Sequence, residues 1–478
     1  MKKRLLLGAL ALIGTLVLAA AIFIATFNVD RYRPQLVHQL ENTLGRPVQL
    51  DRLALGWRGG LAIELRGLAI ADELQAGEPM LEIESASAIM RLVPLLRREL
   101  EVASVVLMRP KIHVHRDAQG HINLLGLAVA ASPAAGGTPS PAGKVPARSA
   151  ASPAAATGQR AVVGDRSFVL RVGTVRITDG AVHWTDQSAT SPADVWLKRL
   201  DVQIHHIVQG QPMDLDARGA LASDTPNVRL HARLTLPRGS TTQTGPGAFG
   251  SVERMSLTVE RLPLDRLLAA PRPGMPQLEG TFTAELEGSV ASLDPARLTQ
   301  AVTGHSHLKL TDMRVTNFNV LREVFGRFSM LPGLVETLEA RLPPEYQAKL
   351  AAHETVFSPV ELTVRVEDGA IQWENLQLRS DTFRLTGAGR VGFDGSLAMR
   401  ATLAIDPTLS TALIKSVTEL QTLTNTSGEL ELPVTVQGVP GHFAVLPDLH
   451  YVASKLLASK AEELLSRVLR KALEGKEP

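Results

Sequence analysis

The sequence contains no cysteine among its 478 residues. This absence excludes disulfide bonds, thiolate catalysis, cysteine-ligated zinc and an N-terminal cysteine that could carry a lipid anchor. Aromatic residues make up only 4% of the chain, which argues against aromatic platforms that stack on carbohydrate. An excess of one charge is also missing, with 50 Lys and Arg residues against 48 Asp and Glu residues. We therefore expect no nucleic-acid partner, because nucleic acid is bound by a clearly basic surface.

Uncharged hydrophobic runs long enough to cross a membrane are missing too, except for residues 5–27. As a helix rising 1.5 Å per residue, this run would be roughly 35 Å long, which suffices for a bilayer core. The basic residues in 1–4 favour a cytoplasmic N-terminus. The alternative is a signal peptide cleaved near Ala19, Ala20 and Ala21, although the run continues beyond the usual length of a signal sequence. We predict a single transmembrane helix with the rest of the chain outside the cytoplasm, which in a bacterium with two membranes is the periplasm.

Most of the remaining sequence alternates apolar and polar residues, which is typical of β-strands with one buried face. Short turns rich in Gly, Pro and Asp separate about eighteen such segments, nearly all in an order that predicts an antiparallel meander. At about 4.8 Å between strands, a single sheet of this kind would be on the order of 85 Å long. The pattern thus predicts a mainly β, elongated molecule with one apolar face.

Composition and periodicity divide the chain into eight segments. Residues 128–159 are rich in Ala, Pro and Ser without periodicity, which predicts a disordered loop. Residues 446–478 show the spacing of an amphipathic helix. The predicted segments are a cytoplasmic tip (1–4), the transmembrane helix (5–27), an N-terminal β region (28–127), the disordered loop (128–159), a central β region (160–316), a helical insertion (317–350), a C-terminal β region (351–445) and the C-terminal helix (446–478).

One phrase occurs twice, as TVRITDGAVHW from Thr174 and as TVRVEDGAIQW from Thr363. Asp-Gly between alternating segments predicts a two-residue β-hairpin turn. The first hairpin would pair Ile177 with Val182 and Val175 with Trp184. The second would pair Val366 with Ile371 and Val364 with Trp373. Two unrelated hairpins with a common pattern would look the same, but either way the phrases predict strands with one apolar face.

These apolar positions are the candidate site residues, because an apolar sheet face must either pack or hold an apolar ligand. The predicted groove-lining residues are Val175, Ile177, Val182, Trp184, Val364, Val366, Ile371 and Trp373.

The sequence offers no enzymatic site. Residues 387–392 match the dinucleotide-binding pattern GxGxxG, but a further turn and strand follow where that motif requires a helix. The pairs His113 with His115 and His305 with His307 have metal-ligand spacing, but no carboxylate cluster accompanies them, and a solvated polar face explains the first pair. We expect no catalytic residue, no metal and no cofactor.

Three stretches of the sequence resemble the AsmA family. They are NVDRYRPQLVHQLENTLGRPVQL at 28–50, VPLLRRELEVASVVLMRPKIHVHRDAQGHINL at 93–124, and the C-terminal region with VEDGAIQWENLQLRSDTFRLTGAGRVGF and LELPVTVQGVPGHFAVLPDL. The second contains an LxxPxIxVxRDxxGxxN-like segment from Leu107 to Asn123. The resemblance implies an inner-membrane-anchored periplasmic protein of Gram-negative bacteria. It also implies a β-sheet bent into an elongated apolar groove, with short helices at both ends and one helical insertion.

The resemblance further implies phospholipid movement to the outer membrane and a part in its assembly, with phospholipid acyl chains, the inner membrane and outer-membrane components as partners. A scaffold that assists outer-membrane protein assembly is the alternative, with the apolar face buried as ordinary core. An envelope hydrolase would need a site that the sequence lacks. The sequence alone does not separate a lipid conduit from a scaffold, because a packed face and a lipid-lined face have the same pattern.

Overall fold

The computed structural model describes most of the chain between residues 29 and 457, with its longer gaps at 73–78, 95–100, 124–170, 238–249, 267–273 and 328–339. The predicted transmembrane helix at 5–27, the cytoplasmic tip, the predicted loop at 128–159 and most of the predicted C-terminal helix lie outside the described residues. Among the helices of the described part, none is both long and apolar enough to cross a membrane.

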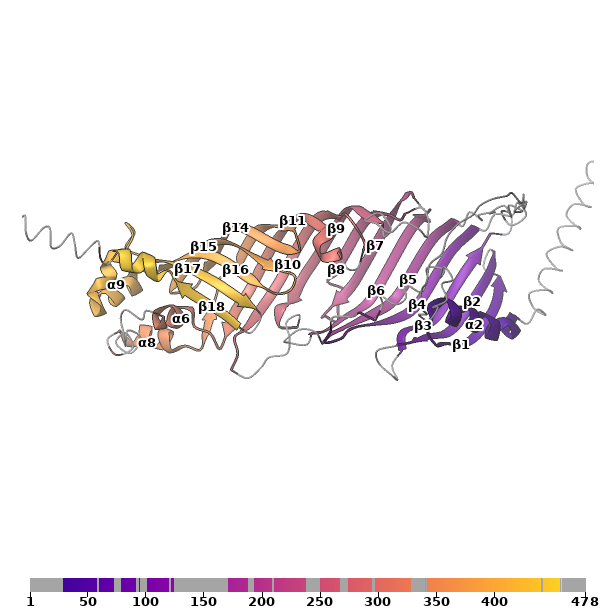
Figure 1. The fold of residues 1–478 in the computed structure, drawn as a ribbon, viewed down its shortest axis with the longest axis horizontal. Helices are drawn as coiled ribbons and strands as arrows, with labels where there is room; N and C mark the ends of the chain where they lie inside the picture. Colours follow the sequence, from indigo (N-terminus) through magenta and orange to yellow (C-terminus); the bar gives the residue numbers. More distant parts are fainter. Residues whose placement is uncertain are drawn as a thin grey trace, which may run out of the picture.

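The described residues form one elongated sheet of 18 strands, as the alternating pattern predicts. Figure 1 shows the strands crossing the long axis of the molecule obliquely, in nearly sequential order. The strands are β1 (Val48–Trp57), β2 (Leu61–Ala71), β3 (Pro79–Met90), β4 (Glu101–Arg116), β5 (Arg171–Asp186), β6 (Ala193–Ile207), β7 (Pro212–Leu221), β8 (Val228–Thr235), β9 (Ser251–Pro263), β10 (Gln277–Val290), β11 (Val302–Thr316), β12 (Glu354–Val356), β13 (Val360–Glu367), β14 (Ala370–Arg379), β15 (Phe383–Gly392), β16 (Leu397–Ile405), β17 (Leu430–Val439) and β18 (His442–Pro447).

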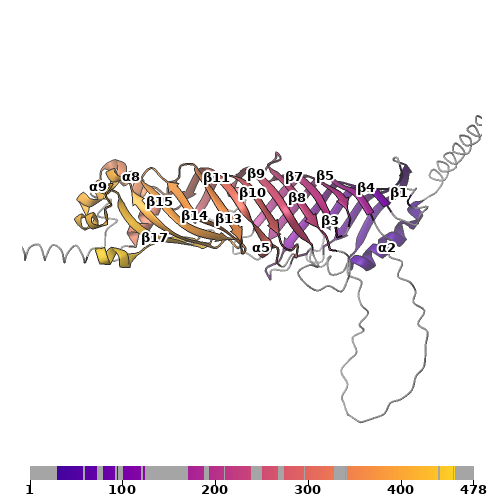
Figure 2. The ribbon, with the colours of Figure 1, turned by 90° about the horizontal axis from the view of Figure 1, so that it is seen from above.

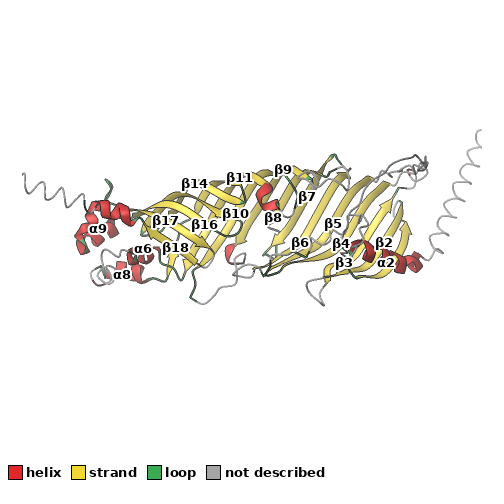
Figure 3. Ribbon diagram, in the orientation of Figure 1, coloured by secondary structure: helices red, strands yellow, loops and turns green. Residues whose placement is uncertain are grey.

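Helices gather mainly at the two ends of the sheet (Figure 3). The helices are η1 (Val29–Tyr32), α2 (Arg33–Leu44), η2 (Leu264–Arg266), α5 (Leu298–Ala301), α6 (Val320–Gly326), α8 (Pro344–Ala351), α9 (Pro407–Ser416) and η3 (Thr418–Leu423). Pro34 lies in the first turn of α2 and Gly45 ends that helix with a left-handed φ of 66°, as the sequence signals predict. Helix α6 falls within the predicted helical insertion at 317–350, and α8 begins within it and ends one residue beyond it, at Ala351.

The meander is antiparallel with one exception. Strand β4 pairs with β5 in parallel, from Glu101 beside Arg171 to Arg116 beside Asp186. Two neighbouring parallel strands begin at the same end of the sheet, so the chain must cross back from the end of the first strand before the second begins. Residues 117–170 lie between these two strands and are long enough to make that return. The predicted long antiparallel meander is therefore confirmed, with this junction as its exception.

The first Asp-Gly phrase does not form the predicted hairpin. Residues 171–186 are one continuous strand, β5, in which Asp179 has a φ of +52° and Gly180 does not share the left-handed conformation. Between Ile177 and Gly180 two residues of β5 oppose one residue of β6, which defines a β-bulge. A type I′ turn needs positive φ at both central residues, and here only Asp179 supplies it. Ile177 and Val182 are therefore not partners, and neither are Val175 and Trp184.

The second phrase forms the predicted hairpin. Asp368 and Gly369 have φ angles of 51° and 68°, which is the pattern of a type I′ turn. Val366 pairs with Ile371 across it, as predicted. The same dipeptide thus bends one strand and connects two others.

Positive φ angles recur at neighbouring positions of adjacent strands, with register shifts at Asp179 and Arg199. Arg109 in β4 lies beside Asp179 in β5, and Arg199 in β6 follows. The Asp201 carboxylate accepts a hydrogen bond of 3.1 Å from the Asp179 backbone N–H and so satisfies a donor displaced by the bulge. Because each bulge bends its strand, such neighbouring bulges bend the sheet along its length. Figure 2 shows the ribbon of the sheet from above.

Replacing Gly369 by Ala should lower the free energy of unfolding by about 1 kcal/mol, because an L-residue in the left-handed region is strained by about that amount. Urea unfolding of the purified full-length chain measures the loss. Gly326→Ala is the matched control: a Cβ at Gly326 meets nothing within 4 Å and Gly326 lacks positive φ. A Gly369→Ala chain as stable as the wild type would contradict the assigned turn.

Candidate functional site

Two rows of mostly apolar residues cross the sheet from end to end, following directly paired positions. The first row is Leu55, Ile63, Ala88, Val105, Val175, Ile204, Leu215, Ala232, Met255, Gly288, Gly304, Val366, Ile371, Val391, Leu397, Gly438 and Phe443. The second is Leu53, Leu65, Ala86, Leu107, Ile177, Val202, Ala217, Leu230, Leu257, Leu286, Ser306 and Val364, and it resumes as Trp373, Gly389, Met399, Val436 and Val445. Together they form the apolar strip.

The predicted site residues lie along this strip. Six of them are members of the two rows: Val175, Ile177, Val364, Val366, Ile371 and Trp373. Val182 and Trp184 lie beyond the bulge in β5, where Val182 pairs with Ile112 and Leu197. Because a bulge adds one residue, it shifts the two-residue alternation by one and keeps these side chains on the same face as Ile177. The two copies of the phrase thus contribute to one face at places far apart along the sheet.

Exposure divides the strip into two halves. From Leu65 in β2 to Leu286 in β10, every residue of the second row is only half-buried. Val364, Met399 and Val445, further along the same row, are 2%, 4% and 4% exposed. The two rows are therefore half-open to solvent over β2 to β10, although Met213, Val252 and Val290 beside them are buried. From β11 to β18 the strip gains buried members, while Ile371, Val391 and Val436 stay half-buried.

Short helices close the C-terminal half of the face. They pack buried side chains onto the strip in one large hydrophobic cluster, which also contains Leu403 and Leu432 of the sheet. Figure 1 shows α6, α8 and α9 grouped at this end of the molecule. The helical contributors are Val320, Leu321, Val324 and Phe325 from α6, Leu350 from α8, Leu409 and Leu413 from α9, and Leu420 and Leu423 from η3.

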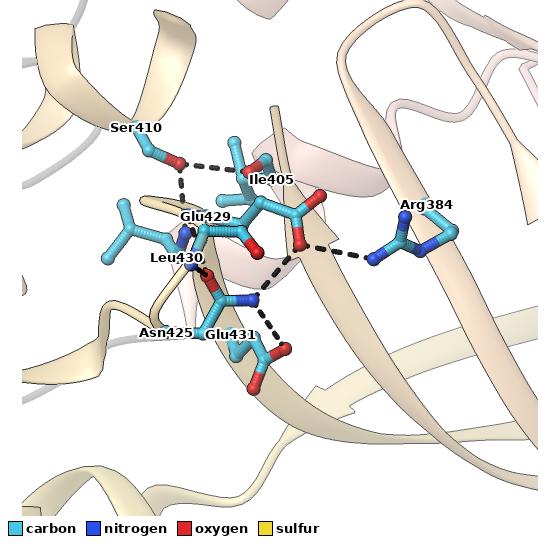
Figure 4. A network of polar contacts seen from close by, with 8 residues as sticks. Arg384, Ile405, Ser410, Asn425, Glu429, Leu430 and Glu431 are labelled. Carbon is cyan, nitrogen blue, oxygen red and sulfur yellow. Dashed lines mark hydrogen bonds and ion pairs between the residues drawn. The ribbon is translucent and has the colours of Figure 1, made fainter. Parts of the chain in front are cut away.

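Polar contacts fasten this helical cover to the sheet (Figure 4). The fully buried Ser410 hydroxyl of α9 donates to the Ile405 carbonyl at 3.0 Å and accepts from the Leu430 backbone N–H at 2.9 Å. Nearby, the Asn425 amide donates to the Glu429 carboxylate at 3.0 Å. Removing such a partner would leave buried donors unsatisfied, so these contacts fix where the cover sits.

The N-terminal end of the sheet is covered differently. Helix α2 packs on a small cluster that includes Val48, and its polar side chains bind the free edge of β1. The Arg33 guanidinium donates to the Leu50 and Asp51 carbonyls at 3.3 and 2.6 Å, and the Glu41 carboxylate accepts from the Val48 backbone N–H at 3.2 Å. An unpaired strand edge is a template for aggregation, and these contacts occupy it.

The face opposite the strip is charged. Arg233 and Asp214 pair across β7 and β8 at 3.0 Å, and the hydrogen bond from Arg233 lowers the pKa of the Asp214 carboxyl. The hydrogen bond from Arg109 likewise lowers the pKa of Glu84. These groups are exposed, so each pair adds little stability. Their role is to keep this face of the sheet hydrated while the other stays apolar.

The structure shows where the GxGxxG pattern and the first histidine pair lie. Residues 387–392 lie within strand β15, and a turn and β16 follow them, so they form no dinucleotide-binding turn. His113 bonds the Pro79 carbonyl at 2.8 Å, and His115 is 7% exposed, so the expectation of a solvated pair is wrong for His115. Within the described residues, no three His, Asp or Glu side chains gather closely enough to hold a metal ion.

A model of the AsmA family matches residues 1–244. The chain belongs to the AsmA family. A comparison with curated proteins gives no match. The matched part of this AsmA-family chain ends between β8 and β9, within the open half of the strip. The resemblance seen in the sequence is thus confirmed for the N-terminal half, and the paired rows show that the apolar strip continues through the rest.

The structure gives a role to the motif that carried the resemblance. Asn123, at the end of that motif, is 2% exposed and accepts from the His115 backbone N–H at 3.0 Å. The side-chain amide of Asn123 donates to the Asp72 carboxylate at 2.6 Å, and the backbone carbonyl of Asn123 accepts from the Arg46 guanidinium at 2.8 Å. The motif therefore ties the end of β4 to β2 and to the segment after α2. The motif is visible in the sequence but these hydrogen bonds are not, because the partners of Asn123 are distant in the chain.

The open and closed halves of the strip should respond differently to a buried charge. Val364→Asp should cost at least about 3 kcal/mol of unfolding free energy, because Val364 is 2% exposed and the carboxylate would lose its hydration. Ile177→Asp should leave the chain folded, because the half-buried position keeps contact with water. Far-ultraviolet circular dichroism during urea unfolding of the full-length chain compares them, with Arg176→Asp on the polar face as control. If Val364→Asp and Ile177→Asp lower the free energy of unfolding by the same amount, the strip is closed core throughout.

Proposed function

We propose that this AsmA-family protein binds and transfers lipid, without being an enzyme. The observation that supports this most directly is the open half of the apolar strip, where half-buried aliphatic side chains run in two continuous rows from β2 to β10. A solvent-exposed apolar surface that crosses nine strands is costly in water unless something apolar covers it. Nine strands at about 4.8 Å give a surface roughly 38 Å long between the first and the last.

Phospholipid acyl chains fit this surface by energy as well as by shape. Each methylene removed from water is worth about 0.8 kcal/mol, so a chain of sixteen carbons would gain on the order of 12 kcal/mol by lying on the strip. Headgroups can stay hydrated, because the strip is open along its length. Lipid could then move along the rows without crossing water as a free molecule.

The family and the sequence support a setting for this activity. We propose that residues 5–27 anchor the chain in the inner membrane, with a cytoplasmic N-terminus and with the sheet in the periplasm. There the protein would contribute to phospholipid transport toward the outer membrane and to outer-membrane assembly. The α2 end of the sheet follows the proposed anchor directly, so the open half of the strip would begin near the inner membrane.

A photoreactive residue placed on the open strip should capture phospholipid in cells. Val202 in β6 is half-buried within the second row, and its neighbour Gln203 is exposed on the opposite face. We expect a lipid adduct from the full-length chain labelled at Val202, and none at Gln203. Mass spectrometry of the purified adduct identifies the lipid.

Two outcomes would count against the proposal. Labels at Val202, Ile177 and Leu230 that all fail to capture lipid, in a chain that is folded by circular dichroism, would exclude lipid on the strip. Capture of outer-membrane proteins at the same three positions instead of lipid would favour the scaffold that assists outer-membrane protein assembly.

A further inference from the structure

The C-terminal half of the sheet contains a hollow of about 1020 Å³. Most residues that line it belong to the charged face, and Val364, Trp373, Gly389 and Met399 of the apolar strip also contribute. It lies over β11 and β13 to β17, and its polar lining includes Arg365, Arg390, Arg400, His305 and His307. A hollow of this size is large enough for a small organic molecule rather than a simple ion.

Strand register places two arginines together in this hollow. Arg390 in β15 pairs directly with Ala398 in β16, and Arg400 in β16 pairs directly with Ala388 in β15. The two arginines are therefore diagonal neighbours on adjacent strands, at roughly 7–8 Å between their backbones. Because each arginine pairs with an alanine on the adjacent strand, no bulky side chain of these two pairs fills the space between the guanidinium groups.

The acidic residues of the hollow already have basic partners. Glu374 accepts a hydrogen bond from Arg365, and Glu361 accepts one of 2.7 Å from Lys309. Arg390 and Arg400 have no acidic group within ion-pair distance in the described part of the chain. Elsewhere on this face, facing arginines and carboxylates neutralise one another, as Arg233 and Asp214 do. Hydrogen bonds from Ser396 and, to a lesser degree, the charge of Arg390 lower the pKa of the nearby Asp394 carboxyl, but neither Arg390 nor Arg400 is in an ion pair with an acidic group in the described part of the chain.

We propose that this hollow binds a phosphate ester through Arg390 and Arg400. A guanidinium group presents a planar fork of N–H donors that matches phosphate oxygens in a bidentate manner. Two such forks approaching from neighbouring strands can hold one phosphate group between them. The side chains of Gln372 and Gln437, which also line the hollow, can donate to the rest of a polar ligand. The ligand is a phospholipid headgroup or a soluble organic phosphate, since both present the same group.

Isothermal titration of the full-length chain in a nonionic detergent tests the site. The probes are glycerol 1-phosphate and dihexanoyl phosphatidylglycerol, a short-chain lipid that dissolves in water. We expect binding that weakens as sodium chloride is raised, because exposed charges are screened by salt. The double variant Arg390→Gln with Arg400→Gln should raise the Kd at least tenfold. Arg254→Gln, an exposed arginine on β9 outside the hollow, should leave the Kd unchanged.

The outcomes distinguish a phospholipid headgroup from a soluble organic phosphate, and some of them would overturn the proposed site. Equal binding of both probes supports recognition of the phosphate ester alone, and tighter binding of the lipid supports a headgroup site. Absence of binding by both, or a double variant that binds as the wild type does, overturns the proposal. Arg390 and Arg400 lie on β15 and β16, whereas Val202 lies on β6 in the open half of the strip. The double variant should therefore keep wild-type lipid capture at Val202, and failure of either proposal leaves the other standing.

Discussion

The need to cover one apolar face governs this molecule. A long sheet that alternates apolar and polar residues cannot leave its apolar side in water without a large cost, and the described residues form no second sheet that could pack against it. The chain meets this need only in part. Its C-terminal half is covered by α6, α8, α9 and η3, whose buried side chains join the strip in one cluster. From β2 to β10 the two rows of the same face stay half-exposed, apart from the small buried cluster of Met213, Leu234, Val252 and Val290 beside them. This difference in cover is what makes the open half the candidate ligand surface.

The opposite face and the two ends follow from the same requirement. Cross-strand ion pairs keep the polar face hydrated, so that only one face needs a partner. The edge of β1 is occupied by side chains of η1 and α2, among them Asp30, which accepts from the Leu53 backbone N–H at 2.9 Å. These contacts leave the open strip as the main apolar surface that the described residues offer. The hollow that Arg390 and Arg400 line lies over β11 and β13 to β17, away from the open half of the strip.

Much of this architecture could be predicted from the sequence, because alternation of side chains is a local property. The strand count, the apolar face and the turn at Asp368 and Gly369 all follow from neighbouring residues. The bulge at Asp179 could not be distinguished from a turn, since Asp-Gly tolerates both and the choice depends on pairing with β4 and β6. The parallel junction depends on residues 117–170, which carry no periodic signal. The burial of Val364 depends on helices whose residues lie elsewhere in the chain, so alternation alone could not separate it from Ile177.

The strand pairings also divide the sheet into three meanders, β1 to β4, β5 to β11 and β13 to β18. Within each meander, partners are close in sequence, so each can form by local hairpin closure. The junctions are different: Arg116 and Asp186 are 70 residues apart, and Lys309 and Glu361 are 52 apart. Folding should therefore proceed as three fast local events followed by two slower docking steps. The sheet also behaves as a one-dimensional array, in which each strand contacts only its neighbours. Its length could thus change through the gain or loss of a whole meander, with both capped ends unchanged.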